Sequence, residues 1–368
     1  MKIGILGTRG IPNHYGGFEQ FAEFFATYAA SCGHEVSVYN SHTHPYKEKN
    51  FKGVQIVHCY DPEIKIGTAG QFFYDLNCIL DARKRDFDII LQLGYTSSSV
   101  WFSLHPKNAI VITNMDGLEW KRTKYSKKVQ KALQIAESLA VKKSDYLIAD
   151  SIGIQKYIKE KYQKESTYIA YGAHNFDNPN PEILKEYQVE PENFNMIMAR
   201  FEPENNLDMV LEGVTLSENK TPILVIGNYN TKYGSYLKNK FEAFSHIRFL
   251  GAVYNLDHLN NLRYYSNLYF HGHTVGGTNP SLLEAMASNA LIAAHNNDFN
   301  KGVLKENAYY FSNADEVKKI LNSIKKSDNL QFVANNYDSI ASTFNWEKIN
   351  EQYLQLFKQC LEGFSRRK

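Results

Sequence analysis

Long apolar runs and paired cysteines are both missing from this sequence. No segment approaches the about 20 apolar residues of a membrane-spanning helix, so any membrane contact is expected to be peripheral. The four cysteines, Cys32, Cys59, Cys78 and Cys360, show no paired spacing, which predicts reduced thiols in a cytoplasmic protein. Residues 1–7 form too short an apolar run for a signal peptide and are typical of a first strand.

A large net charge is missing as well. It is only +2, so the total says little about partners, and none of the features described below indicates a nucleic acid. The basic residues are instead clustered, with Lys121, Arg122, Lys124, Lys127 and Lys128 within eight residues and a basic tail at 365–368. Aromatic residues make up 14% of the chain, and aromatic beside basic side chains suit a membrane interface or a glycan. The alternative for the basic cluster is a solvated helix face.

The length and the apolar pattern predict an α/β protein of two domains. At 368 residues the chain is too long for one ordinary core. Strands are predicted at residues 2–6, 35–39, 54–58, 89–93, 109–113, 146–149, 195–198, 223–226, 247–250, 268–270, 291–294 and 308–311. Helices are predicted at 17–31, 67–83, 124–143, 152–161, 207–216, 232–244, 256–264, from 315 onward, and at 346–361. Such alternation indicates two doubly wound parallel sheets, joined by a polar linker at 172–191, with a cleft between them as a favoured ligand location.

The most informative stretch is 271–287, where a strand-like run leads through a loop into an apolar helix. Thr278 and Asn279 are good N-caps, and Pro280 suits the first helical position. The bare backbone of Gly276-Gly277 lets an anion approach the free N–H groups of that helix. This pattern predicts a site for a phosphorylated ligand in the second half of the chain.

Three side chains of the same stretch add chemistry to this site. Glu284 lies about one turn inside the helix, within reach of a sugar hydroxyl. His271 and His273 suit metal ligands on one strand face, but no third ligand follows at a sensible spacing, so a phosphate or sugar contact is favoured. A pair of histidines packed at the strand end is an equal alternative.

A second glycine-rich loop, residues 7–19, follows the first predicted strand. Its pair Gly16-Gly17 opens a helix and suits a phosphate or a sugar. The spacing is not Gly-x-Gly-x-x-Gly, so the dinucleotide fingerprint is missing. A plain strand–helix turn explains the loop equally well.

Two further loops follow predicted strands. Arg200 stands where a strand gives way to the next helix and is placed to pair with a diphosphate, although this motif alone favours a surface ion pair with Glu202 or Glu204. Asp116, at another strand end, is a candidate to accept a proton or orient a hydroxyl, with helix capping as the equal alternative. Trp120 suits stacking on a sugar face. By contrast, the Asp-Phe-Asp triplet at 86–88 is expected to be a solvated turn.

Taken together, these loops resemble those of bacterial family-4 glycosyltransferases with the GT-B fold. The marks are Gly7-Thr-Arg-Gly-Ile-Pro12, Tyr15-Gly-Gly-Phe-Glu19, Asp116-Gly-Leu-Glu-Trp-Lys-Arg122, Ala199-Arg-Phe-Glu-Pro-Glu-Asn-Asn206, Gly276-Gly-Thr-Asn-Pro-Ser-Leu-Leu-Glu-Ala285 and Phe344-Asn-Trp-Glu347. The resemblance covers nearly the whole chain and is closer to the rhamnosyltransferases that build capsule, O-antigen and rhamnan polysaccharides. It implies two Rossmann-like domains facing a cleft. The acceptor-binding domain would span 1–175, completed by a helix at 346–368 that crosses back, and the nucleotide-sugar domain 176–345.

The chain departs from the general family at two donor-site positions. The family's Glu-x7-Glu motif keeps its second member here as Glu284, but its first position is Gly276. The family also pairs an arginine with a lysine five residues later, and here Asn205 follows Arg200. Both departures are similar to the rhamnosyltransferase subgroup, and fewer charged contacts suit a 6-deoxy sugar, which has one hydroxyl less to hold.

The resemblance implies transfer with retention of the anomeric configuration, without a metal or a separate cofactor, with dTDP-rhamnose as the expected donor. The catalytic residues would be Asp116, Arg200 and Glu284. The donor would be bound by Gly16, Gly17, Arg200, Asn205, Gly276, Gly277, Thr278, Asn279 and Glu284. The acceptor side would carry Arg9, His14, Trp120, Lys121 and Arg122. The implied acceptor is a lipid-diphosphate-linked sugar at the inner face of the cytoplasmic membrane, where the basic cluster would meet anionic lipid.

Three other functions remain open on the sequence. A UDP-hexose donor is the alternative within the transferases. A sugar-nucleotide epimerase shares the two-lobed fold but would convert the donor without any acceptor. A two-lobed sugar-binding protein is the third, but such proteins are usually exported, and the missing signal peptide is evidence against it. A dehydrogenase is disfavoured, because the glycines of the dinucleotide fingerprint are missing.

Overall fold

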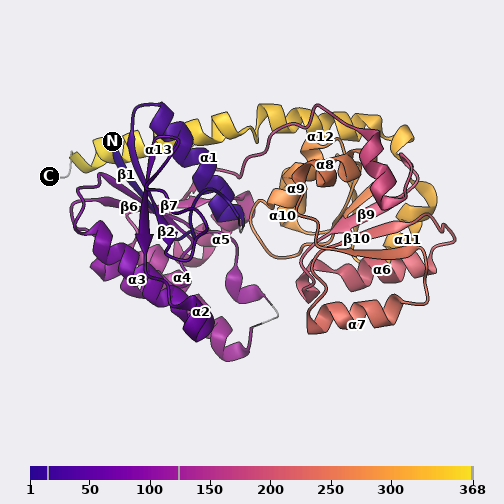
Figure 1. Ribbon diagram of the computed structural model, residues 1–368, viewed down its shortest axis with the longest axis horizontal. Coiled ribbons are helices and arrows are strands. Elements are labelled where there is room, and N and C mark those ends of the chain that lie inside the picture. The colour runs from indigo at the N-terminus through magenta and orange to yellow at the C-terminus, as the bar shows by residue number, and fades with distance from the viewer. Residues whose placement is uncertain (15, 123–124, 366–368) are drawn as a thin grey trace. The chain divides into compact units, whose positions relative to one another are not determined.

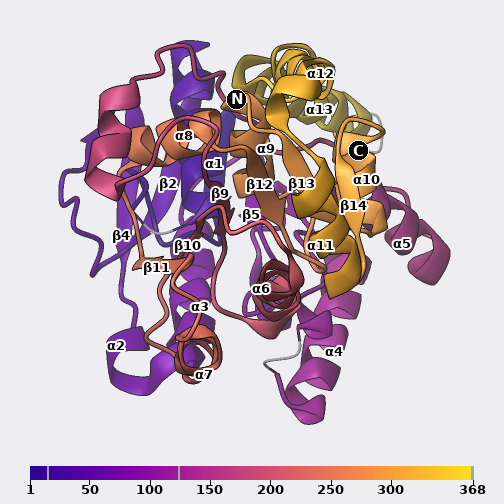
Figure 2. The ribbon, with the colours of Figure 1, turned by 90° about the vertical axis from the view of Figure 1, so that its right-hand side faces the viewer.

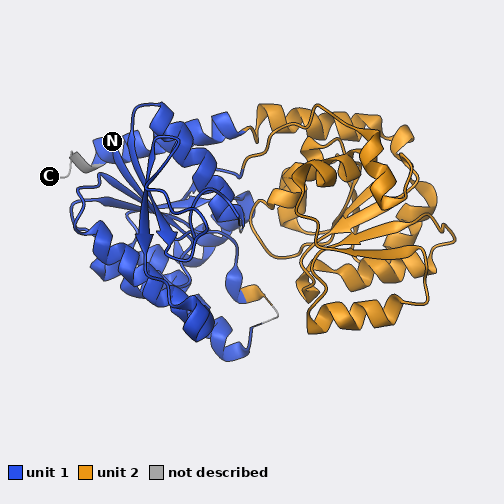
Figure 3. Cartoon of the chain, viewed as in Figure 1, with its two compact units in different colours: residues 1–120, 125–171, 346–368 blue, residues 121–124, 172–345 orange. Residues whose placement is uncertain are grey.

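The computed structural model describes residues 1–14, 16–122 and 125–365 (Figure 1). Tyr15 and Lys124, named in the motifs above, and most of the basic tail lie outside these residues. The chain forms two compact units (Figure 3). Unit 1 comprises residues 1–120, 125–171 and 346–368, and unit 2 comprises 121–124 and 172–345. Each contains a parallel sheet with helices on both faces, which confirms the predicted α/β fold class.

Unit 1 is built on an eight-stranded sheet with the order β3-β4-β2-β1-β5-β6-β7-β8. Its pairs are parallel except for the short β3–β4 hairpin. The strands are β1 Lys2–Leu6, β2 Glu35–Ser41, β3 Asn50–Phe51, β4 Val54–Cys59, β5 Ile89–Leu93, β6 Ile110–Asn114, β7 Tyr146–Ala149 and β8 Thr167–Tyr168. The six long strands were predicted, whereas the two-residue β3 and β8 were not, because so short a run carries no periodicity.

The helices of unit 1 include one that comes from the far end of the chain. They are α1 Gly17–Ser31, α2 Glu63–Ile66, α3 Gly70–Ala82, α4 Lys127–Lys143, α5 Ile152–Tyr162 and α13 Trp346–Ser365, with 3-10 turns η1 Gly67–Ala69, η2 Ser99–Leu104 and η3 Glu119–Lys121. The ring of Tyr353 on α13 lies 4.7 Å from that of Phe21 on α1, and its hydroxyl accepts from Asn114 Nδ2 at 2.9 Å. The predicted return of the last helix to the first half is therefore confirmed (Figure 1).

Unit 2 holds a six-stranded, fully parallel sheet with the order β11-β10-β9-β12-β13-β14. The strands are β9 Asn195–Met198, β10 Ile223–Ile226, β11 Ile247–Gly251, β12 Leu268–His271, β13 Ile292–His295 and β14 Tyr309–Phe311. The helices are α6 Leu207–Leu216, α7 Lys232–Phe241, α8 Leu256–Tyr265, α9 Pro280–Ala287, α10 Asp298–Leu304, α11 Ala314–Ser323 and α12 Leu330–Ser342, with 3-10 turns η4 Pro181–Tyr187, η5 Pro203–Asn205 and η6 Lys326–Asp328.

The sheet of unit 2 is covered on both faces. The apolar sides of α6, α7 and α11, together with Val333 at the start of α12, form one core with it, whereas α8 and α9 cover the other face (Figure 1 and Figure 2). The predicted linker at 172–191 is not free of structure, because η4 lies within it and buries Leu184. Among the helices of the described residues, none has the length and the apolar character needed to cross a membrane.

Candidate functional site

In unit 2 the loops that follow β9 and β12 meet at one edge of the sheet. The two strands are neighbours, and β9 has β10 on its other side, so the order in which the parallel strands follow one another across the sheet reverses here. Asn206 Nδ2 donates to the Gly272 carbonyl at 2.7 Å, and Thr274 donates to the Glu204 carbonyl through both N–H and Oγ1, at 3.1 and 2.8 Å. A Cβ on Gly272 would lie 2.1 Å from the Asn205 carbonyl oxygen, so only glycine permits this approach. Such a switch point is where open α/β sheets bind ligands.

The loop after β9 carries Arg200 and Asn205, which differ in burial and in hydrogen bonding. Asn205 is buried, and its Nδ2 donates to the Arg200 carbonyl at 2.8 Å. The asparagine therefore fixes the backbone of this loop. Arg200 itself is exposed, and within the described residues it forms no ion pair with Glu202 or Glu204. The surface ion pair considered from the sequence is thus not formed.

The start of α9 follows the predicted pattern. The Asn279 Oδ1 caps the helix by accepting from the Ser281 N–H at 3.0 Å, and Pro280 takes the first position. Thr278, the other candidate cap, is buried instead. Gly276 has φ +148°, a conformation that residues with side chains rarely adopt. The loop backbone therefore favours glycine at this position.

Glu284 is held by an arginine that the sequence did not single out. Arg263 on α8 has a fully buried side chain, and its Nη2 donates to Glu284 Oε2 at 2.6 Å. Its Nη1 donates to Asn260 Oδ1 at 2.9 Å, which fixes the guanidinium plane. Within the described residues the second oxygen of Glu284, Oε1, has no partner, and the side chain is 23% exposed. Arg263 thus holds one oxygen of the carboxylate, and the other oxygen is available to accept a hydrogen bond from a ligand.

The two histidines at the end of β12 form a packed pair. Their rings stack at 4.4 Å with an angle of 14° between planes. Burial lowers the pKa of His271 well below its ordinary range, and burial together with the charge of Arg200 lowers the pKa of His273 to about 3. Both rings are therefore uncharged at neutral pH. The described residues contain no group of three or more His, Cys, Asp or Glu arranged to hold a metal ion.

In unit 1 the glycine-rich loop after β1 is tied down by a buried carboxylate. Glu19 Oε1 accepts from the Arg9 N–H at 2.8 Å and from Thr8 Oγ1 at 3.2 Å. Gly16 caps α1 without any side-chain bond, and Tyr171 donates to the Gly17 carbonyl at 3.0 Å. The chain's own glutamate therefore already occupies one of the loop amides that an anion would use.

Asp116 does not cap a helix. Its N–H donates to Asn114 Oδ1 at 3.0 Å and its φ is +51°, whereas Ser126 caps the following helix α4. Within the described residues no hydrogen bond to the Asp116 carboxylate is formed. The capping alternative is thus wrong, and the carboxylate is available for other chemistry.

Trp120 is fixed by a second buried carboxylate, Glu137 on α4. Its Nε1 donates to Glu137 Oε2 at 3.0 Å, and the Lys161 ammonium lies 5.3 Å from its ring centre. One face of the indole is thus already in contact with a cation. Of the other acceptor-side candidates, Lys121 is exposed and Arg122 half-buried.

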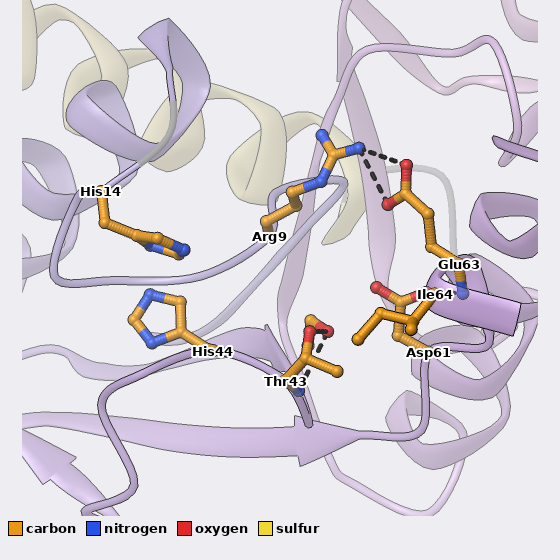
Figure 4. Close-up of a pocket in the computed structure, with 8 residues that line it drawn as sticks. Arg9, His14, Thr43, His44, Asp61, Glu63 and Ile64 are labelled. Atoms are coloured by element: carbon orange, nitrogen blue, oxygen red, sulfur yellow. Dashed lines mark hydrogen bonds and ion pairs between the residues drawn. The ribbon is translucent and has the colours of Figure 1, made fainter. Parts of the chain in front are cut away.

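A cavity of about 250 Å³ opens in unit 1 beyond the carboxyl ends of β1, β2 and β4 (Figure 4). It is lined by Arg9, His14, Ser41, Thr43, His44, Asp61, Glu63 and Ile64. Arg9 Nη2 donates to both Glu63 oxygens, at 2.8 and 2.9 Å, so the arginine charge is neutralised within the wall. The edge of the His14 ring meets His44 at 4.3 Å. Hydroxyls and imidazoles, with one further carboxylate from Asp61, thus dominate the lining.

Beneath this cavity a buried acid makes unit 1 sensitive to pH. Burial raises the pKa of Asp75 from 3.8 to about 7, opposed by the Ser97 hydroxyl, which donates to Oδ2 at 2.5 Å. Between these values the folded chain binds a proton that the unfolded chain has lost, so stability falls as the pH rises through this window. We expect Asp75→Asn to flatten the pH dependence by up to about 1.4 kcal/mol per pH unit. Urea unfolding followed by tryptophan fluorescence at pH 4.5 to 7.5 measures the difference, and equal slopes for the two proteins would contradict it.

Comparisons with known proteins agree with this architecture. Residues 180–338 match the family model "Glycosyl transferases group 1", and residues 1–174 match "Domain of unknown function (DUF1972)". No curated protein matches the sequence.

Solved structures with a similar fold cover almost the whole chain. A sucrose-phosphate synthase from Thermosynechococcus elongatus has a TM-score of 0.78 at 15% identity, over 98% of this chain and 99% of that one. HepE from Anabaena, in complex with UDP and glucose, has 0.75 at 15% identity, over 98% and 100%. WaaG, a glycosyltransferase involved in lipopolysaccharide biosynthesis, has 0.71 at 12% identity, over 97% and 99%. The chain thus has the GT-B fold and carries a glycosyl transferases group 1 domain at residues 180–338, which together support a glycosyltransferase.

Proposed function

We propose that this protein transfers L-rhamnose from dTDP-rhamnose to a lipid-diphosphate-linked sugar during cell-surface polysaccharide synthesis, at the inner face of the cytoplasmic membrane. The observation that carries the proposal is the meeting of the β9 and β12 loops, which brings an exposed arginine, a helix N-terminus and a fixed carboxylate to one switch point. The group 1 domain match supports the transferase activity. The rhamnose donor and the lipid-linked acceptor rest on the sequence resemblance.

The donor nucleotide would bind at this switch point in unit 2. The Arg200 guanidinium and the N–H groups at the start of α9 would hold the diphosphate, since both favour anions. Gly276, Gly277 and the Asn279 cap would shape this cradle, and Asn205 would keep the Arg200 loop in place. Glu284 would accept a ribose hydroxyl through its open Oε1.

The acceptor sugar would bind on unit 1. The cavity with Arg9 and His14 offers hydroxyls, imidazoles and the Asp61 carboxylate, which suit the hydroxyls of an uncharged sugar. Because Glu63 neutralises Arg9, this arginine would shape the wall rather than bind the acceptor diphosphate. Trp120, Lys121 and Arg122 would complete the acceptor side, with the basic cluster toward anionic lipid.

The transfer would proceed with retention, and the leaving phosphate would take the acceptor's proton on the same face of the sugar. No group of the protein then needs to act as a nucleophile. Positioning of the two substrates and stabilisation of the negative charge that develops on the diphosphate would supply most of the rate. Asp116 would orient the acceptor hydroxyl, and no metal ion or separate cofactor is assigned a role.

A donor screen tests the proposal. The purified protein is incubated with dTDP-rhamnose, UDP-glucose, UDP-galactose or UDP-GlcNAc and a synthetic lipid-diphosphate-glucose or -GlcNAc acceptor. Product with dTDP-rhamnose alone, with an anomeric configuration by NMR that matches the donor, supports it. Product only with a UDP-hexose favours the second candidate, to which the binding of UDP and glucose by HepE points. Conversion of donor without acceptor would instead indicate an epimerase.

Asp116→Asn is the matched variant for the orienting role. Asparagine tolerates the left-handed φ of +51° at this position, so the backbone should be kept. We expect kcat to fall about 100-fold, because catalysis by a positioned acid or base contributes at least that much. The rate is measured with saturating donor and acceptor. Full activity in this variant would remove Asp116 from the mechanism.

A further inference from the structure

A second cavity in unit 1 lies at the opposite edge of the sheet from the cavity with Arg9 and His14. It has a volume of about 310 Å³ and is lined by Arg83, Arg85, Asp86, Phe87, Pro106, Lys107, Asn108 and Ala109. These residues precede the neighbouring parallel strands β5 and β6, so the cavity lies at the amino ends of both. Open α/β sheets bind their substrates at the carboxyl ends. The second cavity is therefore separate from the proposed substrate site.

Part of the lining of the second cavity is apolar. Phe87 is 7% exposed and packs on β1, where a Cβ on Gly4 would lie 2.9 Å from its ring. Ala109 is buried and Pro106 half-buried. In the Asp-Phe-Asp triplet at 86–88 both aspartates are exposed, as expected for a solvated turn, whereas the central ring anchors the segment in the core. The cavity thus has a fixed apolar wall that an organic molecule can cover.

Two cations of the lining have no carboxylate partner. Arg83 and Lys107 are exposed, and neither forms an ion pair with another described residue. The Arg83 guanidinium makes one long contact, in which Nη1 donates to the Leu104 carbonyl at 3.4 Å. Within the part of the chain that the structure describes, the backbone N–H groups of Lys107 and Asn108 donate to no protein acceptor. Arginine, lysine and free N–H groups together suit the oxygens of a phosphate.

The other charged groups of the second cavity are already paired. Arg85 Nε donates to Asp81 Oδ1 at 2.5 Å, which holds this guanidinium at the cavity wall. Asp86 lies 3.9 Å from the Lys2 ammonium, and its side chain is 90% exposed, so water and salt screen its charge. The lining contains three cations and one carboxylate and thus carries a net charge of +2.

We infer that the second cavity binds a small phosphorylated molecule. Arg83 and Lys107 bind its phosphate, and its organic part contacts Phe87 and Pro106. Cavities that hold small organic ligands begin at roughly 300 Å³, so the volume suffices. Inorganic phosphate would leave the apolar wall uncovered, whereas an uncharged sugar would leave both cations without a partner. This inference does not depend on the proposed function.

Hydrogen exchange of the full chain in a phosphate-free buffer tests the inference and locates the ligand. The probes are ribose 5-phosphate, inorganic phosphate and ribose. We expect ribose 5-phosphate to protect the peptides that span residues 83–88 and 105–110 at millimolar concentrations. Inorganic phosphate should protect them more weakly, and ribose should not protect them. Since the switch point of unit 2 also attracts phosphate, protection of its peptides is followed separately.

Three variants test the charges of the second cavity. Arg83→Gln with Lys107→Gln should weaken the binding of ribose 5-phosphate at these peptides at least about tenfold, because hydrogen bonds to charged groups are lost. Lys49→Gln with Lys84→Gln is the matched control and should bind like the parent, since both lysines are exposed in unit 1 but do not line the cavity. Asp86→Asn should tighten binding about threefold, because it removes a negative charge beside the phosphate.

The outcomes separate this site from other phosphate sites. Protection by ribose 5-phosphate only at the switch point of unit 2, or at neither place, would overturn the inference. So would equal protection by ribose, or equal weakening in the lysine control. All substituted side chains are exposed, so the variants should fold, and thermal midpoints check this. If the Arg83→Gln, Lys107→Gln protein does not fold, weaker binding in Asp86→Asn would still contradict the site. A failed donor screen would leave these results unaffected.

Discussion

Replacing Glu284 by alanine is expected to destabilise unit 2 by about 2 kcal/mol and to lower kcat/KM about 100-fold. The stability loss arises because Arg263 is fully buried and would lose its carboxylate partner. It should stay below the roughly 3–5 kcal/mol of a fully buried pair, since Glu284 is 23% exposed and water can partly replace it. The activity loss follows from the missing contact to the donor and from the freed guanidinium beside it.

The measurement for Glu284→Ala must report on unit 2. All three tryptophans lie in unit 1, so their fluorescence does not follow the change. The stability of unit 2 is measured instead by hydrogen exchange, at increasing urea concentrations, of the peptides that contain α8 and α9. Glu284→Gln is the control, because it keeps one acceptor for Arg263 and should lose less stability. Unchanged exchange in Glu284→Ala would show that the ion pair contributes nothing, whatever happens to the activity.

Glu137→Ala should destabilise unit 1 by about 4 kcal/mol, the largest change expected for any single residue discussed. The Glu137 side chain is 1% exposed. Its Oε1 accepts from Tyr157 at 2.7 Å, from Tyr162 at 2.6 Å and from Lys161 at 2.9 Å, while Oε2 accepts from Trp120. Alanine would remove the carboxylate acceptor that these four donors share, one of which is charged.

Tryptophan fluorescence suits this second variant, because Trp120 donates directly to Glu137. Urea unfolding gives the free energy of unit 1, and the emission of the folded state reports whether the indole stays in place. Tyr162→Phe is the control, since it removes one donor and should cost about 1 kcal/mol. A loss in Glu137→Ala no larger than in Tyr162→Phe would mean that the carboxylate does not organise its neighbours.

The fold could be predicted from the sequence because its signals are local and redundant. Buried strands of parallel sheets are continuous apolar runs. Both ends of the strands at residues 2–6, 89–93, 195–198 and 223–226 were therefore predicted correctly. Capping and proline chemistry likewise placed the start of α9. Among the elements that were not predicted, β3, β8, α2 and η4 are too short or too polar to carry a periodic pattern, and the seven-residue α10 was missed as well.

The site was predictable only in its loops. The glycines and Arg200 follow strands, and strand ends of a parallel sheet share an edge. The partners that fix the functional groups were missed, because Arg263, Glu19 and Glu137 look like ordinary charged residues of amphipathic helices. Their burial depends on packing against residues that are distant in the sequence, 21 positions away for the Glu284 partner of Arg263 and up to 42 for Glu137. A charged residue at an apolar position of the helical pattern is the one signal that would have revealed them.

The discontinuous composition of unit 1 has a consequence for the order of synthesis. Helix α13, which supplies Tyr353 and Phe357 to the core around Phe25, is translated only after the whole of unit 2. Until then the nascent first half exposes the apolar stripe of α1 to the surroundings, while unit 2, whose chain is continuous from residue 172 to 345, can already close its own core. Folding on the ribosome should therefore run against the usual direction, with the later unit completed first.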